Sequence, residues 1–326
     1  MDFFDTIIAS LLTPMLLSFC LGVFATLIKS DLKFPEGLYI GLTIYLLFAI
    51  GLKGGVKLSS TTFLEIYKPA SAAILICICI PIWSYLILHK ICKLSIVDSA
   101  AVAAHYGSVS AVTFSACISF LETRGIAFEG FMPSMLAIME VPAILIAIFI
   151  ARIQIKSASG STNWGKLLHE LFTGKGILLL MGGLLIGLAS GKKNFEQIAP
   201  LFDAPFRGVL TLFLLEVGLV TGRRLPDLRK AGIPLFLFGI IMPILHSIVG
   251  ITLGKFAGLS IGGATILGVL SASASYIAAP AAIRIALPES SPTYYLTAAL
   301  AITFPFNIAI GLPLYLNFAK YFYGVS

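Results

Sequence analysis

The sequence predicts an all-α, polytopic membrane protein of about ten transmembrane helices, arranged as two inverted sets of five. Three observations support this fold class: the composition, the length of the apolar runs and a repeat of half the chain length. Of the 326 residues, 58% are hydrophobic and 11% are charged, whereas an average soluble domain has about 25% charged residues. Together with the mean hydropathy of +1.01, this composition excludes a soluble enzyme, a nucleic-acid-binding protein and a disordered chain.

The apolar runs are continuous and have the length of membrane-spanning helices. About 20 apolar residues cross a bilayer as a helix, whereas the strands of a membrane barrel would alternate polar and apolar residues. Sequence patterns place helix boundaries to within a few residues. In chain order, we expect spans at residues 6–28, 36–52, 69–88, 97–121, 130–151, 169–191, 205–222, 232–254, 260–284 and 293–318.

A hydrophilic segment divides the chain into two halves. It runs from Arg152 to His169, and its stretch Ser157–Asn163 has the composition of a flexible linker. Five expected spans precede it and five follow. We therefore assign residues 1–151 to a first five-helix repeat, 152–168 to a linker and 169–326 to a second five-helix repeat.

Lysine and arginine are distributed unequally between the two sides of the predicted bundle. Ten spans place both termini on one side, which carries nine of these residues, and the linker on the other side, which carries thirteen. Because cytoplasmic loops are richer in Lys and Arg, we expect a cytoplasmic linker and extracytoplasmic termini in a cell membrane. Residues Met1–Asp5 lack the basic region of a signal peptide, so the first apolar run is expected to be retained.

A shift of 163 residues, half the chain length, places the expected spans on one another. The span at 97–121 then meets 260–284, Ser108–Ala111 meets Ser271–Ala274, and Pro142 meets Pro305. An odd number of spans in each half inverts one half relative to the other, and inverted repeats are typical of secondary transporters. The alternative is a chance match in a chain rich in Ser and Ala.

Two segments at equivalent places in the halves are unusually polar and rich in small residues for helices that face lipid. A helix broken at the membrane midplane has free backbone N–H groups that bind anions, and serine hydroxyls add donors without charge. The alternative is that the serines bond back to their own helix or allow close helix packing. The predicted substrate-binding residues are Gly107, Ser108, Val109, Ser110, Ser271, Ala272, Ser273, Ala274 and Ser275, and Pro280 favours a helix break in the second segment.

Oxygen-bearing residues near these segments are candidates for sodium binding and coupling. Glu140 lies deep in an apolar span, where an ionised side chain costs about 2.5–3.5 kcal/mol or more. Its counterpart after the shift is Thr303, which Asn307 follows. The alternative for Glu140 is a protonated carboxyl bonded to a neighbouring helix. The coupling candidates are Thr113, Glu140, Thr303 and Asn307, and the candidate ligands of Na⁺ are Ser110, Thr113, Ser273 and Ser275.

The sequence carries no signature of an enzyme or of an ATP-driven pump. We expect no cofactor and no metal other than Na⁺ as coupling ion. His105 is interpreted as a core histidine rather than a proton carrier, and the five cysteines as small buried hydrophobic residues.

Several of these segments resemble one known family, in the same order along nearly the whole chain. The stretches Gly107–Phe114, Met139–Ala143, Phe206–Gly208, Leu228–Lys230 and Ser271–Pro280 resemble the sodium-dependent bicarbonate transporter family, best known from cyanobacterial high-affinity bicarbonate importers. The resemblance implies core and gate domains, an elevator-type mechanism, a homotrimer and sodium–bicarbonate symport at the plasma membrane. In the cyanobacterial members a small P-II-like protein binds on the cytoplasmic side, which makes such a regulator a possible partner.

The chain also departs from the cyanobacterial pattern. Those members have Asp where this chain has Glu140, Pro-Pro where it has Pro280-Ala281, and a denser serine run ending in Asp where it has Ser271–Tyr276. Their central insertion is longer than 152–169. These differences bear on the substrate and on the P-II-like partner more than on the architecture.

The function predicted from the sequence is import of a small anion, bicarbonate first, by sodium symport. One alternative is a sodium-coupled organic-anion symporter or a cation exchanger on the same architecture. An exchanger normally needs paired Asp or Lys residues at the midplane, and only Glu140 is available. The other alternative is a membrane sensor or scaffold that transports nothing.

Overall fold

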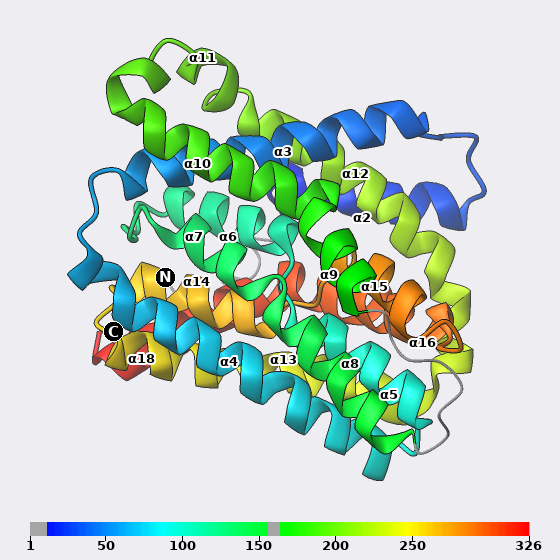
Figure 1. Cartoon of the computed structure of the whole chain (residues 1–326). Helices are drawn as coiled ribbons and strands as arrows, with labels where there is room; N and C mark the ends of the chain where they lie inside the picture. Colours follow the sequence, from blue (N-terminus) through cyan, green and yellow to red (C-terminus); the bar gives the residue numbers. More distant parts are fainter. Residues whose placement is uncertain (1–11, 156–163, 326) are drawn as a thin grey trace.

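The computed structural model describes residues 12–155 and 164–325, and every regular element in these ranges is a helix (Figure 1). The expected span 6–28 therefore lies partly outside the described residues. Seven segments of the described chain are long and apolar enough to cross a membrane: Glu36–Leu58, Phe63–Lys90, Ile96–Thr123, Met132–Gln154, Lys175–Phe195, Ala199–Phe256 and Pro292–Tyr323. Pro14–Leu27 and Ile261–Ala272 are shorter apolar helices.

The count of seven differs from the ten expected spans because two spans are merged, one is broken and the first is described only as the shorter helix Pro14–Leu27. The segment Ala199–Phe256 contains the two long helices α12 and α13, whereas the expected span 260–284 is divided into two short helices, α14 and α15. The helices of the first half are α2 (Pro14–Leu27), α3 (Glu36–Leu58), α4 (Phe63–Lys90), α5 (Ile96–Gly107), α6 (Ala111–Thr123), α7 (Met132–Met139) and α8 (Pro142–Gln154). They are followed by α9 (Trp164–Thr173), α10 (Lys175–Phe195), α11 (Ala199–Phe202), α12 (Phe206–Arg224), α13 (Leu228–Phe256), α14 (Ile261–Ala272), α15 (Ala278–Ala286), α16 (Pro292–Leu296), α17 (Phe304–Phe306) and α18 (Leu312–Tyr323), with π-helical turns at Thr297–Thr303 and Asn307–Gly311.

Four helices, α2, α3, α10 and α12, form one layer, in the upper part of Figure 1. They pack as two close pairs, α2 with α12 and α3 with α10. Glycines allow this approach: a Cβ added at Gly22 would lie 2.1 Å from the carbonyl oxygen of Leu215, and one at Gly55 would lie 2.0 Å from that of Leu184. Small residues have the same effect at other close helix crossings in membranes.

The remaining long helices form a second layer, in the lower part of Figure 1. There α4 packs against α5 and α8, and α13 packs against α14 and α18. The helices α6 and α7 lie between the two layers. Most of the large buried side chains belong to one continuous apolar core that includes residues of both layers.

Two apolar segments are broken in the middle, between α5 and α6 and between α14 and α15. The chain is extended at the residue that follows each first half-helix: Ser108 has φ −84° and ψ 176°, and Ser273 has φ −81° and ψ 162°. Serines also begin the first half-helices, because Ser95 Oγ accepts from the Asp98 N–H and Ser260 Oγ accepts from the Gly263 N–H. The shift of 163 residues pairs Ser108 with Ser271. By the positions at which the helices end, however, Ser108 corresponds to Ser273.

Part of the expected linker, 152–168, is helical. The helix α9 begins at Trp164, and its residues Leu167 and Leu171, one turn apart, are buried. Burial of this apolar stripe explains why a segment of mixed composition is ordered as a helix. The serine-rich stretch 156–163 lies outside the described residues.

Candidate substrate and ion site

The two predicted serine segments lie against each other where the broken helices meet. We call residues 108–110 and 273–277 the crossover. The backbone N–H of Ser110 donates to Ser273 Oγ at 3.0 Å, and the N–H of Ser275 donates to the His105 carbonyl oxygen at 2.7 Å. The structure thus brings together segments that are half a chain length apart in sequence.

Serine hydroxyls hold the local backbone of the crossover. Ser110 Oγ accepts from the Thr113 N–H at 3.2 Å and lies 3.1 Å from Thr113 Oγ1, so it caps α6. Ser273 Oγ donates to the Leu270 carbonyl oxygen at 2.8 Å while it accepts from Ser110. Capping groups of this kind allow a helix to end inside an apolar bundle without leaving its polar groups unpaired.

The predicted residues differ in how they contribute to this arrangement. Ser108 Oγ donates to the Glu140 carbonyl oxygen at 2.8 Å, and Ser275 Oγ accepts from the Ala279 N–H at 3.4 Å. Ser271 Oγ bonds back to Leu267 in its own helix at 2.7 Å, the alternative that sequence reasoning left open. All of the predicted substrate-binding residues are buried: Gly107, Ser108, Val109, Ser110, Ser271, Ala272, Ser273, Ala274 and Ser275.

The crossover provides helix ends of both polarities without formally charged residues. The N-termini of α6 and α15 begin there, and the C-termini of α5 and α14 end there. A helix N-terminus favours an anion, and the carbonyl groups at a helix C-terminus favour a cation. Such a site can therefore hold an anion beside a cation, which is the arrangement used by transporters with broken helices.

Glu140 approaches the crossover by its backbone. It lies at the bend between α7 and α8, where its carbonyl oxygen accepts from Ser108. Its carboxylate lies toward α10, because a Cβ added at Gly176 would be 3.4 Å from Glu140 Oε1. The structure therefore places the carboxylate beside a helix of the other layer.

Thr303 and Asn307 contact different parts of the broken helices. Asn307 Nδ2 donates to the Ala272 carbonyl oxygen at 2.9 Å, at the end of α14, and Asn307 Oδ1 accepts from the Tyr315 hydroxyl at 2.7 Å. Thr303 Oγ1 donates to the Gly239 carbonyl oxygen at 2.7 Å and lies 2.6 Å from the Tyr106 hydroxyl. Of these two residues, only Asn307 forms a hydrogen bond with a predicted substrate-binding residue, Ala272.

Sequence reasoning missed the two tyrosines in these contacts. Tyr106 and Tyr315 are buried, and each hydroxyl is bonded to a coupling candidate. Tyrosine is common in apolar runs, so composition gives no sign of such a partner. The one indication in the sequence was the position of Tyr106, which directly precedes the predicted substrate-binding residue Gly107. His105, interpreted as a core histidine, is bonded through Nδ1 to the Ala101 carbonyl oxygen and stacked on Tyr295.

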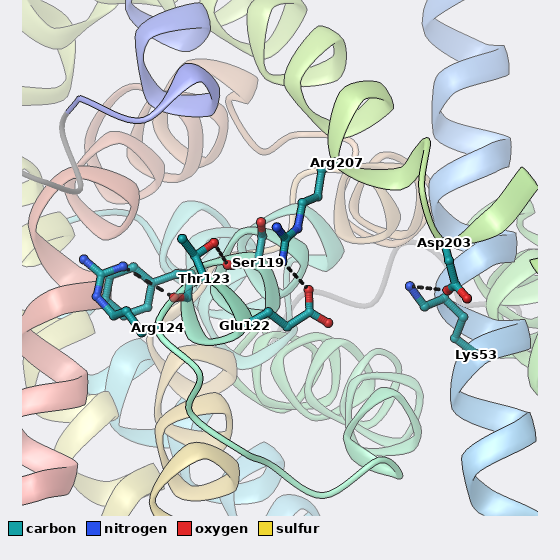
Figure 2. A network of polar contacts seen from close by, with 8 residues as sticks. Lys53, Ser119, Glu122, Thr123, Arg124, Asp203 and Arg207 are labelled. Carbon is teal, nitrogen blue, oxygen red and sulfur yellow. Dashed lines mark hydrogen bonds and ion pairs between the residues drawn. The ribbon is translucent and has the colours of Figure 1, made fainter. Parts of the chain in front are cut away.

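An open cavity of about 870 Å³ lies between the layer of α2, α3, α10 and α12 and the helices α6 and α7, at the end of the molecule that holds the loop 125–130. Its wall includes Phe114 and Ser115 of α6, Ile50 of α3 and Phe195 of α10. Two ion pairs lie at this end: Arg207 Nη2 is 3.0 Å from Glu122 Oε2, and Lys53 Nζ is 3.0 Å from Asp203 Oδ1 (Figure 2). The crossover serines are buried and do not line this cavity. In this structure the crossover is therefore not accessible from the cavity.

The comparison with known protein families gives a match over nearly the whole chain. The family model described as the Na⁺-dependent bicarbonate transporter superfamily matches residues 14–320. This range includes both halves of the crossover and the coupling candidates. No curated protein matches the chain.

Proposed function

We propose that this chain, which belongs to the Na⁺-dependent bicarbonate transporter superfamily, imports bicarbonate by sodium symport. The observation that carries the site is the bond between the Ser110 N–H and Ser273 Oγ, because it joins the two broken helices at one buried point. The described chain contains several apolar helices of membrane-spanning length, which is consistent with a multi-pass membrane protein. Family membership also indicates a transporter rather than an enzyme.

The proposed architecture is an inverted five-plus-five repeat with ten crossings. Two observations support it. Equivalent helices have equivalent partners, since α2 packs on α12 as α10 packs on α3, and α4 packs on α5 as α13 packs on α14. Two cross-repeat bonds, Ser110 to Ser273 and Trp83 to His246, each join residues 163 positions apart. Such pairs are expected where a pseudo-twofold axis passes between two repeats.

In this proposal the anion binds between Gly107–Ser110 and Ser271–Ser275. The N-terminus of α6 supplies backbone donors, and sodium lies beside the anion on the carbonyl and hydroxyl oxygens of Ser110, Thr113, Ser273 and Ser275. Asn307, Thr303 and Glu140 support the ends of the broken helices and couple ion to substrate. Inward movement of one anion against 100 mV costs about 2.3 kcal/mol, and one accompanying Na⁺ cancels that charge.

The two layers correspond to the gate and core domains of an elevator-type transporter. We assign α2, α3, α10 and α12 to the gate, and the second layer together with α6, α7 and the crossover to the core. The cavity of about 870 Å³ between them lies at the end of the bundle assigned to the extracytoplasmic side. Core movement past the gate would then carry the crossover toward the cytoplasmic end.

Further proposals follow from the family resemblance. The protein is a homotrimer in a cell membrane, with both termini outside and the 152–168 linker inside. A P-II-like regulator would then bind on the cytoplasmic face. The gate helices expose apolar residues, among them Leu21, Leu185 and Leu212, which would face lipid or another subunit.

Transport is tested by uptake of radiolabelled bicarbonate into proteoliposomes, with and without an inward sodium gradient, at fixed pH. We expect sodium to stimulate uptake, and a lithium or potassium gradient of equal size to have little effect. Empty liposomes and liposomes with sodium equal on both sides are the controls. Absence of uptake with correctly oriented protein would contradict bicarbonate symport, and uptake of a labelled organic acid would support the alternative substrate class.

A further inference from the structure

His246 is a buried histidine that lies next to the crossover but outside the proposed ligand set. It lies in the middle of α13, and its Nε2 is 2.8 Å from the indole Nε1 of Trp83 in α4. The two rings have centroids 5.7 Å apart and are inclined at 39°. The bond joins the two halves of the chain, as the bond between Ser110 and Ser273 does.

The hydrogen bond from Trp83 fixes the tautomer of His246. An indole N–H can only donate, so Nε2 of His246 accepts and carries no proton. The neutral imidazole therefore has its proton on Nδ1. In the described part of the chain Nδ1 is buried and has no hydrogen-bond partner, although a buried donor is costly to leave unpaired.

The helix α13 packs on the end of α14 beside His246. A Cβ added at Gly268 of α14 would lie 3.1 Å from the carbonyl oxygen of Ser247, the residue that follows His246. One turn further along α13, a Cβ added at Gly250 would lie 2.4 Å from Ser271 Oγ. Residues four apart share one face of a helix, so the face of α13 that carries His246 packs on the last turn of α14.

Neighbouring carbonyl groups in that turn have side-chain donors. The Leu270 carbonyl oxygen accepts from Ser273 Oγ at 2.8 Å, and that of Ala272 accepts from Asn307 Nδ2 at 2.9 Å. The Ser271 carbonyl lies between them in sequence. Because the last carbonyl groups of a helix have no partner within the helix, this group also needs a donor.

We propose that His246 is a positioning residue for the crossover. Its Nδ1–H, held in this tautomer by Trp83, is the donor available to the Ser271 backbone carbonyl, and through this carbonyl it steadies the last turn of α14 together with Ser273 and Asn307. The role of this turn in binding substrate rests on the proposed function. Loss of the Nδ1–H donor weakens substrate binding without changing the chemistry of the site, because His246 does not itself contact the anion.

Two substitutions of His246 distinguish the roles of its two ring nitrogens. In His246→Asn the amide nitrogen occupies the place of Nδ1, two bonds from Cβ, and keeps the donor. In His246→Gln the amide occupies the place of Nε2 and keeps a partner for Trp83 only. We expect His246→Gln to raise the KM of sodium-driven bicarbonate uptake about three- to tenfold with a Vmax within about twofold. His246→Asn should recover most of that loss.

Trp83→Phe and His89→Gln complete the series. Trp83→Phe keeps an aromatic ring but removes the donor that selects the tautomer, so a smaller rise in KM is expected. His89 lies at the end of α4, bonded to the Leu94 carbonyl oxygen, and His89→Gln should have the KM of the unmodified protein. Equal KM values for His246→Asn and His246→Gln, or losses of Vmax and of folded protein in parallel, would overturn the proposal.

A second measurement does not depend on transport. The chain has two tryptophans, so Trp164→Phe leaves Trp83 as the sole indole, whose ¹⁵N–H resonance can be followed in detergent. Sodium and bicarbonate added together should shift this resonance, and His246→Gln should abolish the shift. A shift in protein that takes up no bicarbonate would support the positioning role and contradict symport. No shift, whether or not uptake is observed, would overturn the positioning role.

Discussion

The backbone N–H of Ser110 donates a hydrogen bond to Ser273 Oγ over 3.0 Å, although the two residues are separated by half the length of the chain. The bond joins the residue that caps α6 to the residue that follows α14. Neither residue is formally charged, and both are buried. A ligand that enters between the two helix breaks must therefore replace or rearrange this bond, which makes the pair the first target for substitution.

Ser273→Ala is expected to abolish most of the bicarbonate uptake. The change removes the acceptor for the Ser110 N–H and the donor for the Leu270 carbonyl, and a buried group left unpaired costs about 1–3 kcal/mol. Uptake in proteoliposomes and the yield of folded protein are measured together. Thr265→Val is the matched control, because Thr265 Oγ1 also bonds back within α14, to Ile261, but lies away from the crossover. Normal uptake by Ser273→Ala would contradict the site assignment.

Asn307→Leu is expected to raise the sodium concentration needed for half-maximal uptake. The substitution removes the donor to the Ala272 carbonyl, so the end of α14 is no longer held where its carbonyl oxygens could bind a cation. Tyr315→Phe breaks only the bond between the Tyr315 hydroxyl and Asn307 Oδ1, and a smaller shift in the same direction is expected. A sodium dependence that is unaltered in both variants would show that this end of the helix is not used for coupling.

The Glu140 variants test whether the carboxylate takes part in coupling. The backbone of Glu140 accepts from Ser108 in any substitution, so Glu140→Gln changes the carboxylate alone. If the charge couples sodium to the anion, uptake by Glu140→Gln should lose its sodium dependence, while Glu140→Asp, the residue of the cyanobacterial pattern, should keep it. The ratio of sodium to bicarbonate fluxes measures this. An unchanged ratio in Glu140→Gln would support the alternative of a neutral, structural carboxyl.

The ion pair between Arg207 and Glu122 connects α12 of the proposed gate to α6 of the proposed core. Both side chains are about half exposed, so the pair contributes at most about 1 kcal/mol to stability, but the elevator proposal requires the two residues to separate. Bridging cysteines at 122 and 207 with a short thiol-reactive linker, in a background without the native cysteines, should block uptake until the link is cleaved. The control pair is 53 and 203, which joins α3 of the proposed gate to the turn that leads into the gate helix α12 (Figure 2). Bridging that pair should leave uptake intact, and full uptake by the linked 122–207 protein would argue against relative movement of the layers.

Gly55→Val is expected to destabilise the proposed gate. A Cβ at this position would lie 2.0 Å from the Leu184 carbonyl oxygen, so α3 and α10 must separate, at a cost of about 1–3 kcal/mol or more. Thermal unfolding in detergent measures the loss. Gly41→Ala in the same helix is the control, since a Cβ there has no neighbour within 4 Å, and alanine should even stabilise this helix by about 0.5–1 kcal/mol. Equal melting temperatures for the two variants would contradict the close crossing.

The sequence alone was sufficient for the features that depend on local composition. Membrane helices follow from continuous apolar runs, and the two crossover segments were found because serines and small residues interrupt such runs at equivalent places. The family was recognised from the order of these short stretches, and the match to residues 14–320 confirmed it. Each of these signals is carried by neighbouring residues, so no knowledge of the packing was needed.

Tertiary structure decided which side chain of each segment makes the contacts. Ser273 bonds across to Ser110, whereas Ser271 bonds back to its own helix, and the carboxylate of Glu140 lies toward α10 while its backbone reaches Ser108. The bond between Trp83 and His246 was equally hidden in the sequence. The direction of each side chain depends on where its helix ends and on which helix, over a hundred residues away, packs against it, and neither is encoded in the adjacent residues.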